Sequence, residues 1–259
     1  MNLEGKTIVV TGCASGIGAE TMTTLRTLGA RVIGVDRNQT TGPDEFFQAD
    51  LSDPKSISSL VENLPGDING LANIAGLPPT APADLVIKVN FVGLRFLTCS
   101  LVPKLSDGAS IVNLASLAGF GWMQSLSQIK AAENLEFSSV ERFIVDQGID
   151  KEQGRSYFFS KEALIAWTIK NRWTWRDRNI RMNCVSPGPV ETPILKDFIE
   201  TLGERAEEDM KVMDRPGRPS DIAPVIAFML SDEAAWFRGA NLTLDGGMSS
   251  HILANMNAL

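Results

Sequence analysis

The chain has 259 residues, enough for one large α/β domain or two small ones, and its composition is that of an ordinary globular protein. Its formal net charge of -7 and a pI near 4.9 argue against nucleic acid or an anionic membrane as a partner, because either would require a basic surface. The first apolar run, in KTIVVTG (6–12), is too short for a signal-peptide core or a membrane span, so we expect a cytoplasmic protein.

Short segments rich in β-branched residues alternate with longer segments of helical spacing. The expected strands are KTIVVTG (6–12), RVIGVD (31–36), EFFQAD (45–50), GLANIAG (70–76), SIVNLAS (110–116), IRMNCVSPG (180–188) and NLTLDGG (241–247). This alternation predicts an α/β fold with a doubly wound parallel sheet of about seven strands and helices on both faces. Because no linker-like tract or repeat interrupts it, we predict a single domain over 1–259.

A glycine-rich turn, VTGCASGIGAE (10–20), ends the first strand and opens a helix. Gly12 suits the turn, Gly16 lets the main chain approach a pyrophosphate, and Gly18 permits close packing of helix on strand. The N–H groups at the helix start would then face negative charge. Alone, such a turn is weak evidence for a dinucleotide, since it also serves simply to join a strand to a helix.

Asp36 strengthens the dinucleotide interpretation, because it ends the second strand about 20 residues beyond Gly16, where a carboxylate accepts hydrogen bonds from the adenosine ribose. A 2′-phosphate there would be repelled, so NAD is expected rather than NADP. Arg37 leaves NADP open, because its guanidinium is able to pair with a phosphate. Asp50 and Leu51 end the third strand, where an adenine ring would lie.

Two segments break the regular rhythm of strands and helices. The first, 122–155, places Phe137, Val140 and Ile144 on one helical face and predicts an inserted amphipathic helix or helix pair. Its role stays open between a solvated cap, a pocket wall and a subunit contact. The second, 194–214, mixes apolar and charged residues after a Gly/Pro turn and is expected to close over a ligand.

Tyr157 is the only tyrosine of the chain and lies four residues ahead of Lys161, so a helix would place both side chains on one face. A nearby cation favours the phenolate and lowers the pKa of a phenol, which would let Tyr157 exchange a proton with an alcohol or ketone. On this pair alone, the alternative remains that Tyr157 only packs and Lys161 is solvated.

Cys13, Cys99 and Cys184 are odd in number and widely spaced, which predicts neither a disulfide framework nor a metal site. We expect all three to be small buried apolar residues. The single histidine, His251, is interpreted as part of the C-terminal tail, and no metal is expected.

Six motifs, in order, resemble those of the short-chain dehydrogenase/reductase family over essentially the whole chain. They are TGCASGIG (11–18), NIAG (73–76), IKVNFVG (87–93), VNLAS (112–116), YFFSK (157–161) and RMNCVSPGPVETP (181–193). The resemblance implies a Rossmann-type fold and a catalytic set in which Ser116 binds the substrate oxygen, Tyr157 is the acid/base and Lys161 lowers its pKa. Asn90 would hold a relay water through an irregularity in its helix.

The same resemblance implies the residues that bind the cofactor. They are Gly12, Ser15, Gly16, Ile17, Gly18, Asp36, Arg37, Asp50, Leu51, Asn73, Ala75, Gly76, Tyr157, Lys161, Pro187, Gly188, Val190 and Thr192. Of these, Asn73 would be mainly structural, and Thr192 would touch the carboxamide or the pyrophosphate.

The interval between Ser116 and Tyr157 is longer than in most members of the family, because it contains the predicted insert. Members with a comparable insert include dehydrogenases of coniferyl-type aryl allylic alcohols and of 3α-hydroxysteroids. The resemblance therefore implies an NAD-dependent dehydrogenase of a bulky apolar alcohol. It also implies a homo-oligomer, with a homodimer favoured over the usual tetramer because the insert emerges beside helices that commonly form a subunit interface.

Two other functions stay open. One is a carbonyl reductase that uses NADPH through Arg37. The other is a catalytically silent dinucleotide-binding sensor or scaffold, although such a protein would be expected to have lost Ser116, Tyr157 or Lys161.

Overall fold

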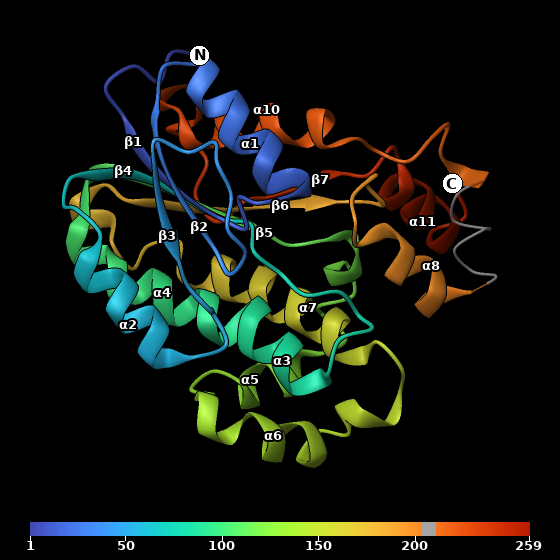
Figure 1. Ribbon diagram of the computed structural model, residues 1–259. Coiled ribbons are helices and arrows are strands. Elements are labelled where there is room, and N and C mark those ends of the chain that lie inside the picture. Colours follow the sequence, from blue (N-terminus) through green and yellow to red (C-terminus); the bar gives the residue numbers. More distant parts are fainter. Residues whose placement is uncertain (204–210) are drawn as a thin grey trace.

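The computed structural model describes residues 1–203 and 211–259, which fold around one parallel sheet (Figure 1). The strands are β1 (Thr7–Thr11), β2 (Arg31–Asp36), β3 (Glu45–Gln48), β4 (Ile68–Asn73), β5 (Leu105–Leu114), β6 (Arg181–Pro187) and β7 (Asn241–Leu244). All seven predicted strands are confirmed. Each of the central ones is buried almost throughout, as expected for strands covered on both faces.

The order across the sheet is β3-β2-β1-β4-β5-β6-β7, so successive strands are added toward one edge up to β3 and toward the other edge from β4 onward. In register, Val9 lies opposite Ile33 of β2 on one side and Leu71 of β4 on the other. Such a reversal of the strand order leaves a crevice outside the carboxyl ends of the two central strands. The expected doubly wound sheet is therefore present, and its topology fixes where a ligand would bind.

The helices cover both faces of the sheet. They are α1 (Gly16–Thr27), α2 (Pro54–Asn63), α3 (Ala83–Ile87), a π-helical segment (Lys88–Gly93), α4 (Leu94–Leu101), α5 (Leu126–Ala131), α6 (Val140–Asp146), α7 (Arg155–Lys170), α8 (Leu195–Leu202), α10 (Pro219–Leu230) and α11 (Met248–Met256). Short 3-10 turns lie at Val102–Lys104, Leu117–Gly119, Phe137–Ser139, Ile149–Lys151, Arg176–Arg178 and Asp232–Ala234. Helices α1 and α10 lie on one face, and α2, α4 and α7 on the other (Figure 1).

The helix formed by residues Ala83–Lys104 is long and apolar enough to cross a membrane by length and composition. In the fold, however, 67% of its most apolar window is buried. Leu97 and Leu101 on its inner side pack into the core beneath the sheet with Ile111 of β5. We therefore interpret it as a core helix.

The insert before α7 forms a small layer of its own beneath α3 and α7 (Figure 1). Val140, Phe143 and Ile144 of α6 are buried in a cluster with Phe159 of α7, and the rings of Phe143 and Phe159 lie 5.4 Å apart. Phe137 packs edge-on against Phe96 of α4. The predicted amphipathic face is confirmed, and it covers one side of the helix that carries Tyr157.

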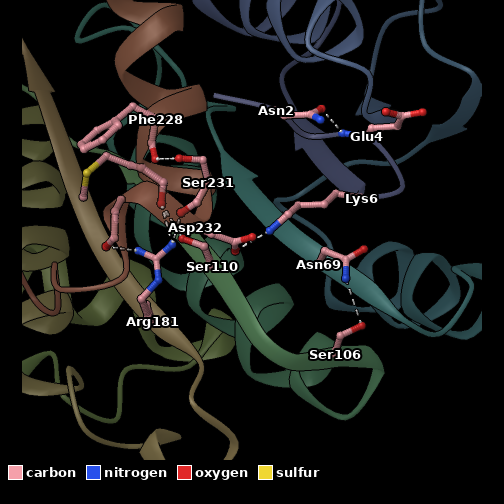
Figure 2. Close-up of polar contacts among 12 residues, drawn as sticks. Asn2, Glu4, Lys6, Asn69, Ser106, Ser110, Arg181, Phe228, Ser231 and Asp232 are labelled. Atoms are coloured by element: carbon pink, nitrogen blue, oxygen red, sulfur yellow. Dashed lines mark hydrogen bonds and ion pairs between the residues drawn. The ribbon is translucent and has the colours of Figure 1, made fainter.

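At the amino end of β6, opposite the crevice, a buried arginine joins the sheet to α10 (Figure 2). The Arg181 guanidinium donates to the backbone carbonyls of Met229, Ser231 and Ala234, at 3.1, 2.9 and 2.9 Å. These carbonyls belong to the end of α10 and the turn after it, where helix carbonyls need outside donors. The arginine therefore closes the carboxyl end of α10.

Two of the three cysteines match the expectation and one does not. Cys13 and Cys184 are buried, whereas Cys99 is exposed. The reason is helical geometry: α4 buries Leu94, Leu97, Thr98 and Leu101, which places Cys99 on its outer side. The prediction for Cys99 was therefore wrong.

Candidate active site

The glycine turn lies at the carboxyl end of β1, and its glycines are required by contact with neighbouring main chain. Gly12 has a φ of +73°, and a Cβ there would lie 2.8 Å from the backbone of Ala75. A Cβ on Gly18 would lie 1.9 Å from the carbonyl oxygen of Gly12. Any side chain at either position would force helix α1 away from β1 and β4. The turn is thus held flat against the end of the sheet.

The turn after β6 meets the glycine turn across the crevice. A Cβ on Gly16 would come within 3.2 Å of the Thr192 side chain, so these two residues are near neighbours. Pro187 ends β6, Gly188 donates its N–H to the Leu244 carbonyl, and buried Val190 pairs with Gly217. The structure therefore brings the first and last parts of the predicted cofactor site together.

Asp36 stands beside the glycine turn, as expected. Its Oδ2 accepts a hydrogen bond from the Ala14 N–H at 3.0 Å, and its Oδ1 accepts one from the Asn38 N–H at 2.9 Å. The neighbouring Arg37 is exposed. The carboxylate is thus held against the glycine turn at the end of β2.

The remaining predicted cofactor residues lie along the same edge. Ser15 precedes α1, and among the described residues no side chain caps that helix start. Ile17 packs into the core below the turn. Asp50, just after β3, accepts hydrogen bonds from the N–H and hydroxyl of Ser52. Leu51 is buried, and its carbonyl oxygen lies 2.0 Å from where a Cβ on Gly93 would stand. These residues fit a dinucleotide lying across the crevice.

Asn73 serves the sheet, in agreement with the structural role expected for it. It is buried at the end of β4, and its Nδ2 donates to Thr98 Oγ1 of α4 and to Asn113 Oδ1 of β5, both at 2.9 Å. Ala75 and Gly76 follow directly and face the glycine turn and Asn90. Asn73 thereby fixes the position of the loop that lines the crevice.

Asn90 lies within the π-helical segment 88–93, which confirms the expected irregularity. Its amide forms a pair of hydrogen bonds with the backbone of Leu77: Oδ1 accepts from the N–H at 2.7 Å and Nδ2 donates to the carbonyl at 3.0 Å. Both Asn90 and Lys161 border Gly76: a Cβ added to this glycine would lie 3.4 Å from Asn90 Oδ1 and 3.8 Å from Lys161 Nζ. Asn90 therefore lies close to Lys161 of α7.

Helix α7 presents Tyr157 and Lys161 on one face, as their spacing predicts. The Lys161 ammonium lies 5.5 Å from the centre of the Tyr157 ring and donates to the Leu114 carbonyl at 2.8 Å. Ser116 lies just beyond β5, where its hydroxyl accepts from the Ala118 N–H at 3.2 Å and acts to lower the pKa of Tyr157. Ser116, Tyr157 and Lys161 therefore converge where β5 and α7 meet the crevice.

The two ionisable groups of this set are buried, and burial dominates their titration. Burial raises the pKa of Tyr157 to about 12, although the Ser116 hydroxyl opposes this. Burial lowers the pKa of Lys161 to about 8, in spite of the nearby Cys184. From the sequence we expect Lys161 to lower the pKa of the Tyr157 phenol. In the protein alone, desolvation of the phenol is the larger effect, so Tyr157 stays protonated at neutral pH.

An aromatic residue that sequence reasoning did not single out covers Tyr157. The Phe198 ring of α8 lies 4.8 Å from the Tyr157 ring, edge to face, and the Thr80 hydroxyl donates to Asp197 Oδ1 at 2.5 Å. In the segment that follows Ser116, Phe120 and Trp122 are half-buried, but Met123 is 60% exposed. Phe198 lies in the segment 194–214 that was singled out after the Gly/Pro turn, but which of its side chains points toward Tyr157 depends on tertiary packing.

Most of the chain is similar to known dehydrogenases. A short chain dehydrogenase family model matches residues 6–132, and one described as enoyl-(acyl carrier protein) reductase matches residues 140–249. The coniferyl-alcohol dehydrogenase of Pseudomonas sp. strain HR199 is 44% identical over 254 residues, covering 96% of this chain and 99% of that protein. The chain belongs to the short-chain dehydrogenase/reductase family.

Two further proteins are similar to this short-chain dehydrogenase, one in sequence and one in structure. The 3-alpha-hydroxysteroid dehydrogenase/carbonyl reductase of Comamonas testosteroni is 30% identical over 252 residues, covering 94% of this chain and 96% of that protein. The 3-alpha-hydroxysteroid dehydrogenase of Pseudomonas sp. B-0831, solved with NADH, has a TM-score of 0.82 and 30% identity, with 98% of this chain and 99% of that chain covered. The chain is thus an oxidoreductase of the alcohol dehydrogenase/carbonyl reductase type with a dinucleotide-binding fold.

Proposed function

We propose that this short-chain dehydrogenase interconverts a bulky, largely apolar alcohol and its carbonyl with NAD as cofactor, and that Asn90, Ser116, Tyr157 and Lys161 form its catalytic set. The observation that carries the proposal is the buried Tyr157 phenol, which lies beside Lys161 and under the Phe198 ring. A phenol in such surroundings is able to hold and exchange a proton with a substrate oxygen while apolar groups exclude water.

The chain's own residues would act in the following way. Ser116 donates a hydrogen bond to the substrate oxygen and holds it beside the phenol, which takes the hydroxyl proton in oxidation and returns one in reduction. Lys161 places a positive charge near the ring, and Asn90 fixes the loop at Leu77 on the other side of the crevice. A bound nicotinamide dinucleotide would supply the hydride acceptor or donor.

The preference for NAD is supported by the place of Asp36. Its carboxylate lies beside the Ala14 N–H, where a 2′-phosphate would bring two like charges together. We expect purified protein to bind NADH more tightly than NADPH, and Asp36→Asn to reduce that preference about tenfold. Glu45→Gln, in the exposed Arg31–Glu45 ion pair, serves as the control. A wild-type preference for NADPH would instead favour a carbonyl reductase that uses Arg37.

An aryl allylic alcohol of the coniferyl type is the first substrate class, because of the 44% identity to a coniferyl-alcohol dehydrogenase and the aromatic Phe198 over the phenol. A 3α-hydroxysteroid is the second, supported by the neighbour with a TM-score of 0.82. The segment 194–214 would form the substrate side of the crevice. Its residues 204–210 lie outside the described residues.

The experiment is NADH formation from NAD with coniferyl alcohol or a 3α-hydroxysteroid, using wild type and Tyr157→Phe. We expect turnover of the aryl alcohol, its loss by about a factor of 10³ in Tyr157→Phe, and unchanged NADH binding in that variant. Full activity of Tyr157→Phe would contradict the role of the phenol. No turnover of any alcohol or ketone by wild type would favour a silent dinucleotide-binding protein.

We also infer a single dinucleotide-binding domain over 1–259, a cytoplasmic location and a homodimer. The insert 122–155 supports the last point, because its helices cover α3 and α7 of the same chain and leave that side less available to a second subunit. Sedimentation or light scattering of the purified protein tests the assembly, and a tetramer would contradict it.

A further inference from the structure

The catalytic tyrosine occupies a weakly secured position in its helix. Tyr157 is the third residue of α7, whose N-cap is Gly154 in the left-handed conformation. Within the described residues no side chain caps this helix start, and no acidic residue lies in its first turn. The first helical residue is instead Arg155, whose positive charge is unfavourable beside the amide end of the helix dipole.

This arrangement matters because helix ends open most easily. The Tyr157 N–H donates to the Gly154 carbonyl at 2.9 Å, a bond that belongs to the first turn. A glycine N-cap leaves the first turn less stable, by roughly a few tenths of a kcal/mol, than a capping side chain would. A displacement of about 1 Å in a catalytic group can lower a rate about a hundredfold. Some other contact must therefore hold the turn in place.

Arg155 supplies that contact by reaching back along its own helix and out to the insert. Its Nη2 donates to Glu162 Oε2 at 2.8 Å, two turns further along α7. The same nitrogen lies 3.0 Å from Ser125 Oγ and 2.9 Å from Gln128 Oε1, on α5 and the residue before it. The side chains of Arg155 and Glu162 are only 18% and 9% exposed.

The insert side of this cluster is itself fixed. Gln128 Nε2 donates to the Gln147 carbonyl at 2.9 Å, which joins α5 to the end of α6. The Arg155 guanidinium also lies 5.8 Å from the Phe159 ring, which packs on Phe143 of α6. Arg155 is therefore held between the catalytic helix and the two insert helices.

We propose that Arg155 is a positioning residue for Tyr157, and that with Glu162, Ser125 and Gln128 it takes the place of the missing helix cap. The insert is then part of the catalytic scaffold, since two of the three acceptors of Arg155 come from it. The inference rests on the proposed role of Tyr157 as the acid/base. A buried ion pair adds little net stability compared with apolar residues of similar volume. Stability therefore does not explain why Arg155 and Glu162 are charged, whereas a positioning role does.

The test uses the full-length protein and four variants: Arg155→Met, Glu162→Gln, the double variant Arg155→Met/Glu162→Met, and Arg142→Met as control. Arg142 is an insert arginine that pairs with Asp146 while 88% exposed. Rates are measured well below each melting temperature with coniferyl alcohol, unlabelled and deuterated at the carbinol carbon. NADH affinity and the pH dependence of kcat are measured in parallel.

We expect Arg155→Met and Glu162→Gln to lower kcat about 10- to 100-fold, with NADH affinity unchanged and the pH midpoint of kcat displaced. The deuterium isotope effect on kcat should rise, because the chemical step becomes slower. The double variant should regain stability but not kcat, and Arg142→Met should match wild type.

A double variant with wild-type kcat and pH profile would overturn the inference, because the pair would then matter only for stability. This variant also serves if Arg155→Met does not fold. Tyr157→Phe, measured alongside, separates the two proposals. If it is inactive while Arg155→Met retains wild-type kcat, only the positioning role fails. If Tyr157→Phe is active, the proposed function fails as well.

Discussion

The protein buries a cation at each end of its parallel sheet, and the two are held very differently. Arg181 and Lys161 are both only 4% exposed. At the amino end of β6, Arg181 donates to three carbonyls that close α10. At the carboxyl end, the described part of the chain offers the Lys161 ammonium one acceptor, the Leu114 carbonyl, and burial lowers the pKa of Lys161 to about 8.

The difference separates a cation that stabilises the fold from one for which we propose a role in catalysis. A buried charge is favourable only when enough hydrogen bonds replace its hydration. Arg181 meets that condition and Lys161 does not. The same face also holds Tyr157 as a buried phenol with a pKa raised to about 12. Groups placed against their own solvation preferences concentrate where function requires them.

The largest effect is expected in turnover when Lys161 is removed. Lys161→Met should lower kcat by a factor of about 10² to 10⁴, because the phenol then has no cation beside it. Lys170→Met is the matched control, since Lys170 lies on the same helix but is 59% exposed and pairs with Glu133. Steady-state kinetics with NAD and the alcohol measure kcat. An unchanged kcat in Lys161→Met would contradict a role for this buried cation in catalysis.

A smaller but clear effect is expected in stability when Arg181 is removed. Arg181→Met should lower the free energy of unfolding by about 2–3 kcal/mol, because three buried carbonyls lose a charged donor. The kcat of the folded variant should not change, since Arg181 lies at the far end of the sheet. Urea unfolding followed by circular dichroism measures this, with the exposed Arg176→Met as control. Equal stability of the two variants would show that Arg181 does not close α10 as we argue.

The smallest effect is a gain in stability in Lys161→Met that depends on pH. The folded pKa of about 8 lies below the ordinary 10.5, so the charged form opposes folding at pH 7 by at most about 3 kcal/mol. After the lost hydrogen bond to Leu114, we expect the variant to be about 1–2 kcal/mol more stable than wild type at pH 7.

The sign of the pH dependence follows from the same shift. A depressed lysine pKa means that wild-type stability rises relative to the variant as pH increases from about 8 to 10, where the folded lysine loses its proton before the unfolded one. The difference between the two melting temperatures should therefore shrink over that interval. A difference that stays constant with pH would mean that the ammonium is better solvated than its burial indicates.

The strands could be predicted from the sequence, and so could the shared helix face of Tyr157 and Lys161, because both depend on local patterns. The β-branched runs, the three glycines and the spacing of Tyr157 and Lys161 each carry a physical requirement that is visible in a few adjacent residues. What the sequence could not place depends on contacts between distant segments. Phe198 covers Tyr157 through the packing of α8, and the burial of Tyr157 reverses the expected direction of its pKa shift.

The contact between Arg155 and Glu162 could be predicted only in part. They are seven residues apart on a predicted helix, which places them on one face two turns apart. That spacing alone predicts only a surface ion pair, because nothing in the sequence says that α5 folds back over it. For Cys99 the local pattern was misleading: its apolar surroundings in the sequence predicted burial, but its side chain is exposed.

The π-helical segment at 88–93 has a consequence for how this chain can change. Each residue of an α-helix turns the chain by about 100°, and the wider π turn accommodates one residue more than an α turn would. Within the segment, Asn90 is hydrogen-bonded to Leu77; downstream, Leu97 and Leu101 face the core. Deleting one residue between them would rotate one of these sets of side chains away from its partners. The segment is therefore fixed by contacts on both sides of such a deletion, and single-residue deletions within it should be among the least tolerated length changes in the protein.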